Sequence, residues 1–433
     1  MMDLDFVKNN PEKIKKAIEQ KNIDFDLDVF LALDNERRSV LAIVEEMRRK
    51  QNEFSRKVTS LDEADKQKFF SDMKVVANDL KQKQAQLKEI EQKWHEMQLM
   101  IPNIPSEDTP VGPDDKGNVE VEKWGTPRQF DFPFKDHITL GKQLNLIDLD
   151  RGVKTSGFRG YYLKNEAASL QMAILFYAFN KMREKGFEMM ITPTILRDFA
   201  LVGSGHFPFG KDDVYQLANT GKEETGANIG ETLYLGGTSE PSVLAYFSDT
   251  VLEEKDLPKM ACGFSQCYRN EVGSYGKDTK GLYRIHEFMK VEQVVLCRAD
   301  IKESDEWLEK LRVNSQEILK DLELPHRVVQ VCTGDMGAGK RKMYDIETWM
   351  PSRNDYGETH SDSNLTDWQA RRLNIKYKTA EGEKKYVYAL NNTVIASPRI
   401  LIAILENYQN EDGSIDVPKV LQPLCGCKKI NKK

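Results

Sequence analysis

Residues 267–292 read CYRNEVGSYGKDTKGLYRIHEFMKVE, and this stretch carries the most informative pattern in the chain. Arg269 and Glu271 are two positions apart, and the same spacing links five later residues: Arg284, His286, Phe288, Lys290 and Glu292. Side chains two apart on a strand share a face. The pattern therefore predicts two strands joined by a glycine-containing loop. Their shared surface would suit an anion, a cation and a planar ring; the alternative is a solvent-exposed hairpin with ordinary cross-strand ion pairs.

The segments around this stretch predict an α+β fold, in which helices flank an antiparallel β-sheet. Strand-like runs cover residues 282–297, 327–332, 343–350 and 386–390, and apolar helical patterns cover 167–185 and 400–407. The connections are long and uneven, without a regular alternation of strand and helix. This argues against a parallel sheet and favours an antiparallel one.

The first hundred residues have a different character, because they contain no glycine and no proline between Pro11 and Pro102. Two series step by three and four residues, and all their members are apolar except Gln51 and Lys83: Val40, Val44, Met47, Gln51, Phe54 and Val58, then Phe69, Met73, Val76, Leu80, Lys83, Leu87, Ile90, Trp94 and Met97. This spacing predicts two long helices, about 31–59 and 62–98, folded into an antiparallel coiled-coil hairpin. Two ordinary bundle helices are the alternative. A shorter helix should precede them, starting at Pro11.

The composition and the positions of glycine and proline suggest where the domains begin and end. Residues 101–117 are rich in proline and read as a linker. We expect a helical N-terminal region over 1–105, a linker over 106–118 and a globular domain over 119–433. The net charge is −6, so a nucleic acid would have to bind a local basic cluster. Five basic residues gather near the far end of the hairpin, where phosphate binding and a merely solvated face are equally compatible with the spacing: Arg48, Arg49, Lys50, Arg56 and Lys57.

Several classes of protein do not fit this sequence. The six cysteines include no CxxC pair, so we expect no zinc site and no disulfide scaffold. No apolar run is long enough to span a membrane, and the start, with Asp3 and Asp5, lacks a secretory signal. We therefore expect a cytoplasmic protein without a membrane partner.

The segment Gly334–Lys340 matches the GxxxxGK pattern of phosphate-binding loops. Such a loop needs serine or threonine next, and a helix whose N-terminus faces the phosphate. Here Arg341 follows, and residues 343–350 alternate like a strand. We do not expect a phosphate-binding loop of this kind.

Residues 267–292 resemble motif 2 of the class II aminoacyl-tRNA synthetases, and with Asp278–Leu282 they are similar to the seryl-tRNA synthetase family in particular. Further resemblances are spread over the chain: motif 1 and its dimer-interface proline at 186–193, the serine-binding segment at 237–240, the approach to the ATP site at 345–351 and 356–361, motif 3 at 390–399, and the tRNA-binding arm at the N-terminal hairpin. Two departures are visible. Asn392–Pro398 stands where many members have a glycine-rich segment, and Asp362 stands where cysteine is common.

This resemblance implies a class II synthetase fold and a homodimeric ligase. It would activate L-serine with ATP and Mg²⁺ and transfer the serine to tRNA(Ser); whether tRNA(Sec) is also charged stays open. The resemblance assigns catalysis to Arg269, Glu271 and Arg399, with Arg269 on the α-phosphate and Arg399 on the γ-phosphate.

The remaining roles that the resemblance implies are binding roles. Serine would contact Thr238, Ser239, Glu240, Glu292, Asn391 and Thr393. ATP would contact Arg269, Asn270, Glu271, Arg284, Ile285, Phe288, Glu358, Thr359, His360, Ser361 and Arg399, with Phe288 and Arg399 on the two faces of the adenine. Magnesium would bind Glu358 and Ser361, and tRNA would bind the five basic residues of the hairpin.

Overall fold

The computed structural model describes residues 1–57, 63–219, 221–222, 226, 230–272 and 280–432 of the 433 in the chain. The side chains of residues 54–72 lie outside this description, as does the loop at 273–279. The predicted turn between the two long helices, and the roles expected for the Arg56 and Lys57 side chains, therefore fall outside the described residues. The chain divides into two compact units, Met1–Pro102 and Asn103–Lys433.

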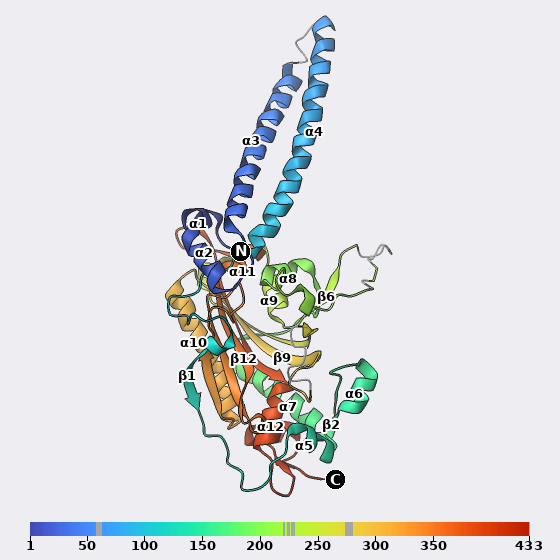
Figure 1. Cartoon of the computed structure of the whole chain (residues 1–433), viewed down its shortest axis with the longest axis vertical. Helices are drawn as coiled ribbons and strands as arrows, with labels where there is room; N and C mark the ends of the chain where they lie inside the picture. Colours follow the sequence, from blue (N-terminus) through green and yellow to red (C-terminus); the bar gives the residue numbers. More distant parts are fainter. Residues whose placement is uncertain (58–62, 220, 223–225, 227–229, 273–279, 433) are drawn as a thin grey trace. The chain divides into compact units, whose positions relative to one another are not determined.

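The smaller unit is entirely helical in its described part and contains the predicted hairpin (Figure 1). Its helices are α1 (Leu4–Asn9), α2 (Pro11–Gln20), α3 (Leu27–Lys57) and α4 (Glu63–Met100). α3 and α4 run side by side and bury apolar residues between them, at positions that the heptad spacing predicts: Val40, Val44, Leu80, Leu87 and Ile90. The two long helices are thus confirmed. α1 was not expected, although Asp3 caps it by accepting a hydrogen bond from the Phe6 amide (2.9 Å).

The base of the hairpin is held by one buried carboxylate. Asp34 of α3 is 1% exposed and accepts a hydrogen bond from the indole nitrogen of Trp94 in α4 (3.0 Å). It also pairs with Lys8 of α1 (2.8 Å) and Arg37 (3.1 Å). Because a buried charge is tolerated when it is paired and hydrogen-bonded, Asp34 joins three helices at a defined point.

The larger unit is built around an eight-stranded sheet in the order β1-β10-β11-β12-β15-β9-β8-β4. Every neighbouring pair is antiparallel except β4 and β8. The strands are β1 (Val119–Trp124), β4 (Glu188–Ile191), β8 (Lys259–Tyr268), β9 (Glu287–Cys297), β10 (His326–Gln330), β11 (Lys342–Met350), β12 (Asp355–Thr366) and β15 (Tyr388–Ser397). The predicted antiparallel α+β fold is confirmed.

Helices and small sheets surround this central sheet. The helices are α5 (His137–Gln143), α6 (Leu149–Ser156), α7 (Asn165–Glu184), α8 (Asp198–Ser204), α9 (Glu240–Tyr246), α10 (Ile301–Asp321), α11 (Trp368–Leu373), α12 (Arg399–Asn407) and α13 (Gln422–Cys425). The short strands are β2 (Ile147–Asp148), β3 (Tyr162–Leu163), β5 (Ile195–Arg197), β6 (Leu233–Leu235), β7 (Val251–Glu253), β13 (Lys376–Lys378), β14 (Lys384–Tyr386), β16 (Ile415–Asp416) and β17 (Lys429–Ile430). None of the helices in the described residues is long and apolar enough to cross a membrane.

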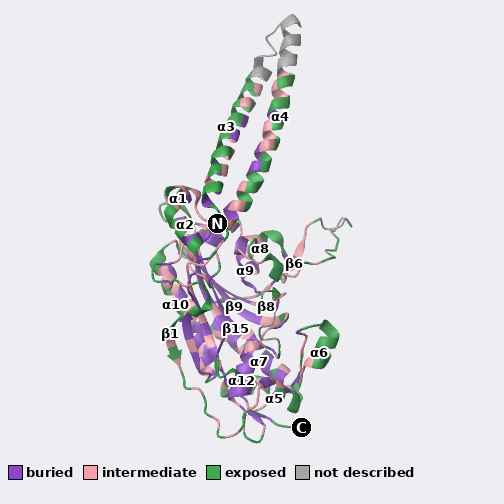
Figure 2. Cartoon of the chain, viewed as in Figure 1, coloured by how far each residue is buried: buried purple, intermediate pink, exposed green. Residues whose placement is uncertain are grey.

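The two faces of the sheet differ in what covers them. One face packs on α7, α10 and α12, and together they form the large hydrophobic core that Figure 2 shows as buried. On the other face, α9 and α11 cover a smaller apolar cluster that includes Val294 and Leu296 of β9. Glu292 and Lys290 share the parity of these two residues, so their side chains lie on this second face. Polar residues of β12 and β15 accompany them, and this is where the site forms.

The predicted strands are largely found, with one correction near the site. The run expected from residue 282 becomes a strand only at Glu287, so Arg284 and His286 precede β9 and do not share its face. The partner strand β8 ends at Tyr268, and Glu271 then takes a left-handed conformation (φ 55°), which turns the backbone away. Among the described residues, the Arg269 N–H still donates to the His286 carbonyl (3.0 Å), one position beyond the paired strands, and the ladder does not extend further.

The other expected segments need smaller adjustments. The run expected at 386–390 divides between β14 and β15, whereas β11 and α12 match their predicted positions closely. The predicted strand, and not a helix, follows Lys340, so the segment Gly334–Lys340 lacks the helix that a phosphate-binding loop of this kind leads into.

The proline-rich segment packs against the larger unit. Asn103 is buried, and its amide donates hydrogen bonds to the carbonyl oxygens of Gly339 (3.1 Å) and Leu365 (2.9 Å). Further along, Gly112 approaches Cys332 so closely that an added Cβ would lie 3.1 Å from its sulfur. The predicted linker is therefore fixed to this unit along part of its length.

Candidate functional site

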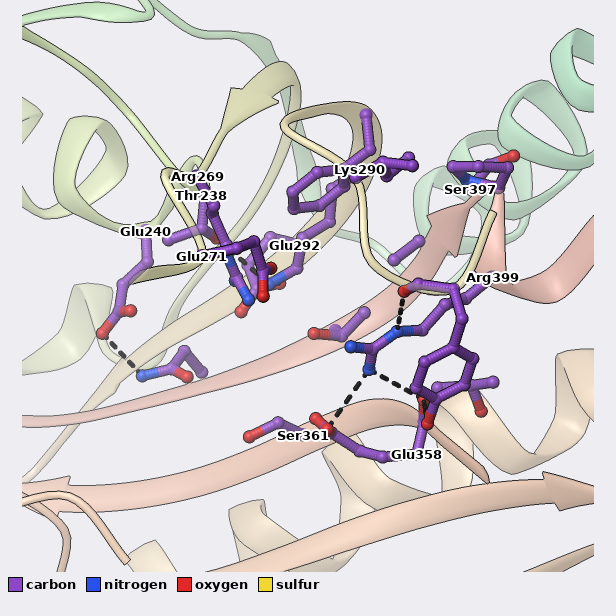
Figure 3. A pocket seen from close by; sticks show the side chains of 18 of the residues that line it. Thr238, Glu240, Arg269, Glu271, Lys290, Glu292, Glu358, Ser361, Ser397 and Arg399 are labelled. Carbon is purple, nitrogen blue, oxygen red and sulfur yellow. Dashed lines mark hydrogen bonds and ion pairs between the residues drawn. The ribbon is translucent and has the colours of Figure 1, made fainter. Parts of the chain in front are cut away.

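A cavity lies on the polar face of the sheet, between the ends of β8 and β9, the strands β12 and β15, and the start of α12 (Figure 3). Most of the residues predicted from the sequence line it: Thr238, Glu240, Arg269, Glu271, Ile285, Phe288, Glu292, Glu358, Thr359, Ser361, Asn391, Thr393 and Arg399. These residues come from segments far apart in the chain. The antiparallel order of β12, β15, β9 and β8 brings them together.

Four residues predicted for the site are not part of the cavity lining. The Ser239 hydroxyl donates to the Gly263 carbonyl (3.2 Å), and the Asn270 amide donates to the Asp212 carbonyl (3.2 Å). Burial lowers the pKa of His360 to about 3, so this imidazole is neutral at pH 7. Arg284 contacts the cavity lining through Glu271: its Nη1 donates to Glu271 Oε2 (3.2 Å).

Glu240 lies at one end of the cavity, and the groups that donate hydrogen bonds to its carboxylate are neutral. Its Oε1 accepts from the side-chain amides of Gln369 (2.6 Å) and Asn391 (2.7 Å). Both donors are neutral, so they orient the carboxylate and leave its negative charge for a cation. The neighbouring His206 also lines the cavity, and burial lowers its pKa, which keeps it neutral as well.

A second carboxylate, Glu292, faces the same space. It is 2% exposed and pairs with Lys290 (2.6 Å), whose Nζ also donates to the Thr238 hydroxyl (3.2 Å). Burial raises the pKa of Glu292, and the pairing with Lys290 acts against that rise. Lys290 was not assigned to the site from the sequence, although its position between Phe288 and Glu292 was a signal that it shares their face.

Two arginines face each other across the rest of the cavity. Arg269 follows β8 directly; its Nε donates to the Gly237 carbonyl (3.3 Å), and its guanidinium lies 5.2 Å from the centre of the Phe288 ring. Arg399 begins α12 and donates from Nε to the Tyr283 carbonyl (3.1 Å), while its guanidinium lies 4.3 Å from the Tyr283 ring. Guanidinium groups so placed can bind phosphate oxygens through two parallel hydrogen bonds.

The carboxylate of Glu358 lies beside Arg399 (Figure 3). Glu358 Oε2 lies 3.2 Å from Arg399 Nη1. Across the β11–β12 pair, Glu358 faces Glu347 and Ser361 faces Asp345. Burial, then the charges of Glu358, Asp335 and Glu347, raise the pKa of Asp345 well above its usual range. Among the described residues, no group of three or more acidic, histidine or cysteine side chains is placed to hold a metal ion.

Lys340 also lines the cavity and donates from Nζ to the Ser363 hydroxyl (2.6 Å). Neither Lys340 nor His206 was predicted: Lys340 ends the GxxxxGK segment that was rejected as a phosphate-binding loop, and no local pattern marks His206. Both reach the cavity through loops whose course depends on the tertiary fold.

The basic residues predicted on the hairpin are partly described. The side chains of Arg48, Arg49 and Lys50 on α3 are exposed. Lys50 pairs with Glu46 (2.7 Å), and Arg49 lies 4.0 Å from Glu53. Pairs this exposed are weak, so the three side chains are available to a polyanion.

Comparisons with known proteins identify the family of the chain. Residues 1–105 match the model of the seryl-tRNA synthetase N-terminal domain, and residues 223–408 match that of the tRNA synthetase class II core domain (G, H, P, S and T). Two similar relatives are serine–tRNA ligases from Deinococcus radiodurans, 41% identical with 99% of each chain covered, and from Symbiobacterium thermophilum, 39% identical with all of each chain covered. A solved relative is seryl-tRNA synthetase from Pyrococcus horikoshii complexed with ATP, with a TM-score of 0.87, 34% identity and full coverage of both chains. Because these matches span the whole chain, the protein belongs to the seryl-tRNA synthetase family of class II aminoacyl-tRNA synthetases.

Proposed function

We propose that the cavity binds L-serine and ATP side by side, and that this serine–tRNA ligase joins them there into seryl-adenylate before it transfers serine to tRNA(Ser). The single observation that carries the proposal is the composition of the cavity. Buried carboxylates at one end suit an amino group, and two arginines at the other suit phosphates. The relative from Pyrococcus horikoshii was solved with ATP, which supports the nucleotide.

The first step needs no general base. The α-carboxylate of serine has a pKa of about 3.5 and is ionised at pH 7. One of its oxygens attacks the α-phosphorus of ATP, a new P–O bond forms, and the bond to the β-phosphate oxygen breaks to release pyrophosphate. The remaining work is to align the reactants and to stabilise negative charge on the phosphates.

The two arginines would divide this work. Arg269 would bind the α-phosphate, where charge develops, and Arg399 would bind the γ-phosphate. Phe288 would stack on the adenine, with Ile285 beside it and Glu271 at the adenine or ribose. Arg284, Asn270, Thr359 and His360 would support this part of the site. Arg284 can act through Glu271, which it already contacts.

Magnesium fits the carboxylate side of the cavity. Glu358 and Ser361 would hold it, because both line the cavity and both offer oxygen ligands. When bound, the ion supplies positive charge to the phosphates. Burial first, and then the neighbouring carboxylates, raise the pKa of Asp345, which lies opposite Ser361 across the strand pair.

The serine end supplies partners for an ammonium and a hydroxyl. Glu240, which its amide neighbours orient, would accept from the ammonium group, with Thr238 close to it. Thr393 and Glu292 would bind the hydroxyl, and Asn391 and Ser239 would fix Glu240 and the wall around it. A buried site that hydrogen-bonds a hydroxyl rejects alanine, because alanine would leave these groups unpaired.

The helical hairpin would bind the tRNA. The exposed side chains of Arg48, Arg49 and Lys50, with Arg56 and Lys57 further along α3, can neutralise phosphates of tRNA(Ser). A match to the seryl-tRNA synthetase N-terminal domain over residues 1–105 supports this role. Since ATP and tRNA meet the translation machinery in the cytoplasm, we also propose a cytoplasmic location.

The protein would act as a homodimer. Large apolar side chains are exposed near the edge strand β4, including Ile191 (83% exposed) and Phe176 of α7 (55%). A solvent-exposed apolar patch at a sheet edge is typical of a subunit interface. Ile191→Asp should therefore halve the mass measured by light scattering, and an unchanged mass would place the interface elsewhere.

Charging of unfractionated tRNA with radiolabelled amino acids tests the proposed function. The purified protein should attach serine to tRNA in an ATP-dependent reaction and should attach neither alanine nor threonine at a comparable rate. Efficient attachment of another amino acid, or no attachment of serine, would overturn the proposal.

A further inference from the structure

We propose that His137, held by Glu406, is a positioning residue that fixes the backbone at Leu282 and Tyr283 and thereby orients Arg399 for ATP. The inference rests on the proposed function, because the residue that His137 would orient is Arg399, which is proposed to bind ATP. His137 begins α5 and does not line the cavity. It acts through the segment that leads into β9.

The hydrogen bonds determine which nitrogen of His137 carries the proton. The Leu282 backbone N–H donates to His137 Nε2 (3.2 Å), so Nε2 is the acceptor. The proton must then lie on Nδ1, which is 2.8 Å from Glu406 Oε1. Leu282 and Glu406 are fully buried and His137 is 8% exposed, so water does not readily replace either bond.

Glu406 is itself held in place by neutral donors. Its Oε1 also accepts from the His137 backbone N–H (3.0 Å) and from the Ser352 hydroxyl (2.8 Å), and its Oε2 accepts from the Ser352 backbone N–H (3.0 Å). A carboxylate with this many fixed donors cannot reorient. It therefore selects the Nδ1–H tautomer of His137 in the way that a carboxylate orients a histidine in a catalytic triad or a metal site.

The bond to Leu282 matters because of the next residue. Tyr283 offers its carbonyl to Arg399 Nε, its ring lies against the Arg399 guanidinium, and its hydroxyl donates to the Glu358 carbonyl (3.4 Å). Arg399 and Glu406 both belong to α12, two helical turns apart. The Leu282–Tyr283 segment is thus attached to one helix at two points, directly through Arg399 and indirectly through His137 and Glu406.

Gly281 shows how closely the imidazole approaches this backbone. A Cβ at Gly281 would lie 2.2 Å from His137 Nε2, and the residue has a φ of +76°. Only glycine combines this conformation with this clearance. The loop between Glu271 and Leu282 therefore ends at a point that His137 fixes.

Two substitutions at the same position separate the two bonds. In His137→Gln, the amide oxygen can reach the place of Nε2 and accept from Leu282. In His137→Asn, the amide nitrogen can reach the place of Nδ1 and donate to Glu406, but the side chain is too short to accept from Leu282. The full-length enzyme would be assayed for serine-dependent pyrophosphate exchange, with separate titrations of ATP and serine, and its thermal unfolding would be measured.

We expect the glutamine variant to stay close to wild type, and the asparagine variant to lose about 10–100-fold in kcat/KM for ATP, the usual effect of losing an outer-shell partner. The KM for serine should change little in both, because Glu240 and Thr393 are not attached to this segment. Should His137→Asn not fold, Glu406→Gln tests the same link and should also raise the KM for ATP, because a neutral amide oxygen holds the Nδ1 proton less strongly than a carboxylate and its NH₂ group would face the Ser352 backbone N–H.

The controls distinguish failure of this inference from failure of the proposed function. A wild-type enzyme without serine-dependent exchange would contradict the proposed function. An active wild type whose asparagine and glutamine variants have equal kcat/KM for ATP would overturn only the positioning role. The same holds if ATP and serine titrations change in parallel with a fall in thermal stability, since that pattern indicates a general structural role.

Discussion

Replacing Arg269 with alanine should nearly abolish serine activation and leave the fold intact. In the free protein this side chain makes one hydrogen bond, to the Gly237 carbonyl, and one ring contact, to Phe288. Within the described part of the chain it forms no ion pair with a carboxylate. Its charge is thus available to the substrate. Removing it should cost the fold about 1 kcal/mol, the value of an ordinary hydrogen bond.

The cost to catalysis should be much larger. A donor aimed at charge that develops in the transition state contributes about 3–4 kcal/mol, so exchange should fall by about 10²–10³-fold. Arg269→Lys keeps the charge but loses the planar fork, and should lie between alanine and wild type. Arg298→Ala is a matched control, because Arg298 is an exposed arginine paired with Glu303 (2.6 Å), and it should have no effect on exchange.

The assay is serine-dependent exchange of pyrophosphate into ATP, together with a thermal melt of each variant. A folded Arg269→Ala enzyme that loses less than about tenfold, or 1.4 kcal/mol, would refute the phosphate role. Equal losses in Arg269→Ala and Arg298→Ala would show that the assay reports stability and not catalysis.

Three further substitutions and two changes in the hairpin test the serine contact, the metal site, the tRNA-binding role and the buried Asp362. Thr393→Val should weaken serine activation by about 1–3 kcal/mol and improve the relative use of alanine, so an unchanged serine-to-alanine ratio would exclude Thr393 as the hydroxyl contact. Glu358→Gln should raise the Mg²⁺ concentration that gives half-maximal exchange, whereas an unaltered Mg²⁺ titration would remove Glu358 from the metal site. Replacing residues 40–90 by a short Gly-Ser loop spares the Asp34–Trp94 bond, and it should leave exchange largely intact but greatly reduce tRNA charging. Neutralising the five basic residues should reduce charging less and should make it less sensitive to salt. Normal charging without the hairpin would contradict its role. Asp362→Asn should stabilise the fold more at about pH 8 than at about pH 5, because burial raises the pKa of Asp362 in the folded state. The folded state therefore binds this proton more tightly than the unfolded state, and wild-type stability falls as pH rises through the folded pKa. Thermal midpoints whose difference does not grow with pH would contradict this.

Much of the architecture could be predicted because it follows from local periodicity. The three- and four-residue steps of Val40, Val44, Leu80 and Leu87 mark the seam that α3 and α4 bury. The two-residue steps of Phe288, Lys290 and Glu292 mark one face of β9. In both cases the buried face repeats with the period of the element, so the sequence carries the information directly.

The errors arise where tertiary contacts decide the outcome. Arg284 and His286 continue the alternation of β9, yet they are not in a strand, because β8 ends at Tyr268 and the paired strands therefore end before these residues. The orientation of Glu240 depends on Gln369, which is remote in sequence and reaches it only in the folded sheet.

Long-range contacts also explain the remaining omissions. Lys340 ends a GxxxxGK segment that lacks the serine or threonine of a phosphate-binding loop, so that segment gave no reason to place Lys340 on the cavity wall. The hydrogen bond between Leu282 and His137 joins residues that are far apart in sequence, and it depends on Glu406 of α12, which holds the imidazole.

Pyrophosphate exchange measured separately with each of the twenty amino acids tests the central claim most directly, since it requires only the cavity, ATP and an amino acid. Serine alone should support rapid exchange in the absence of tRNA, with alanine and threonine far behind it. Exchange that is fastest with another amino acid, or that does not depend on any amino acid, would contradict the account.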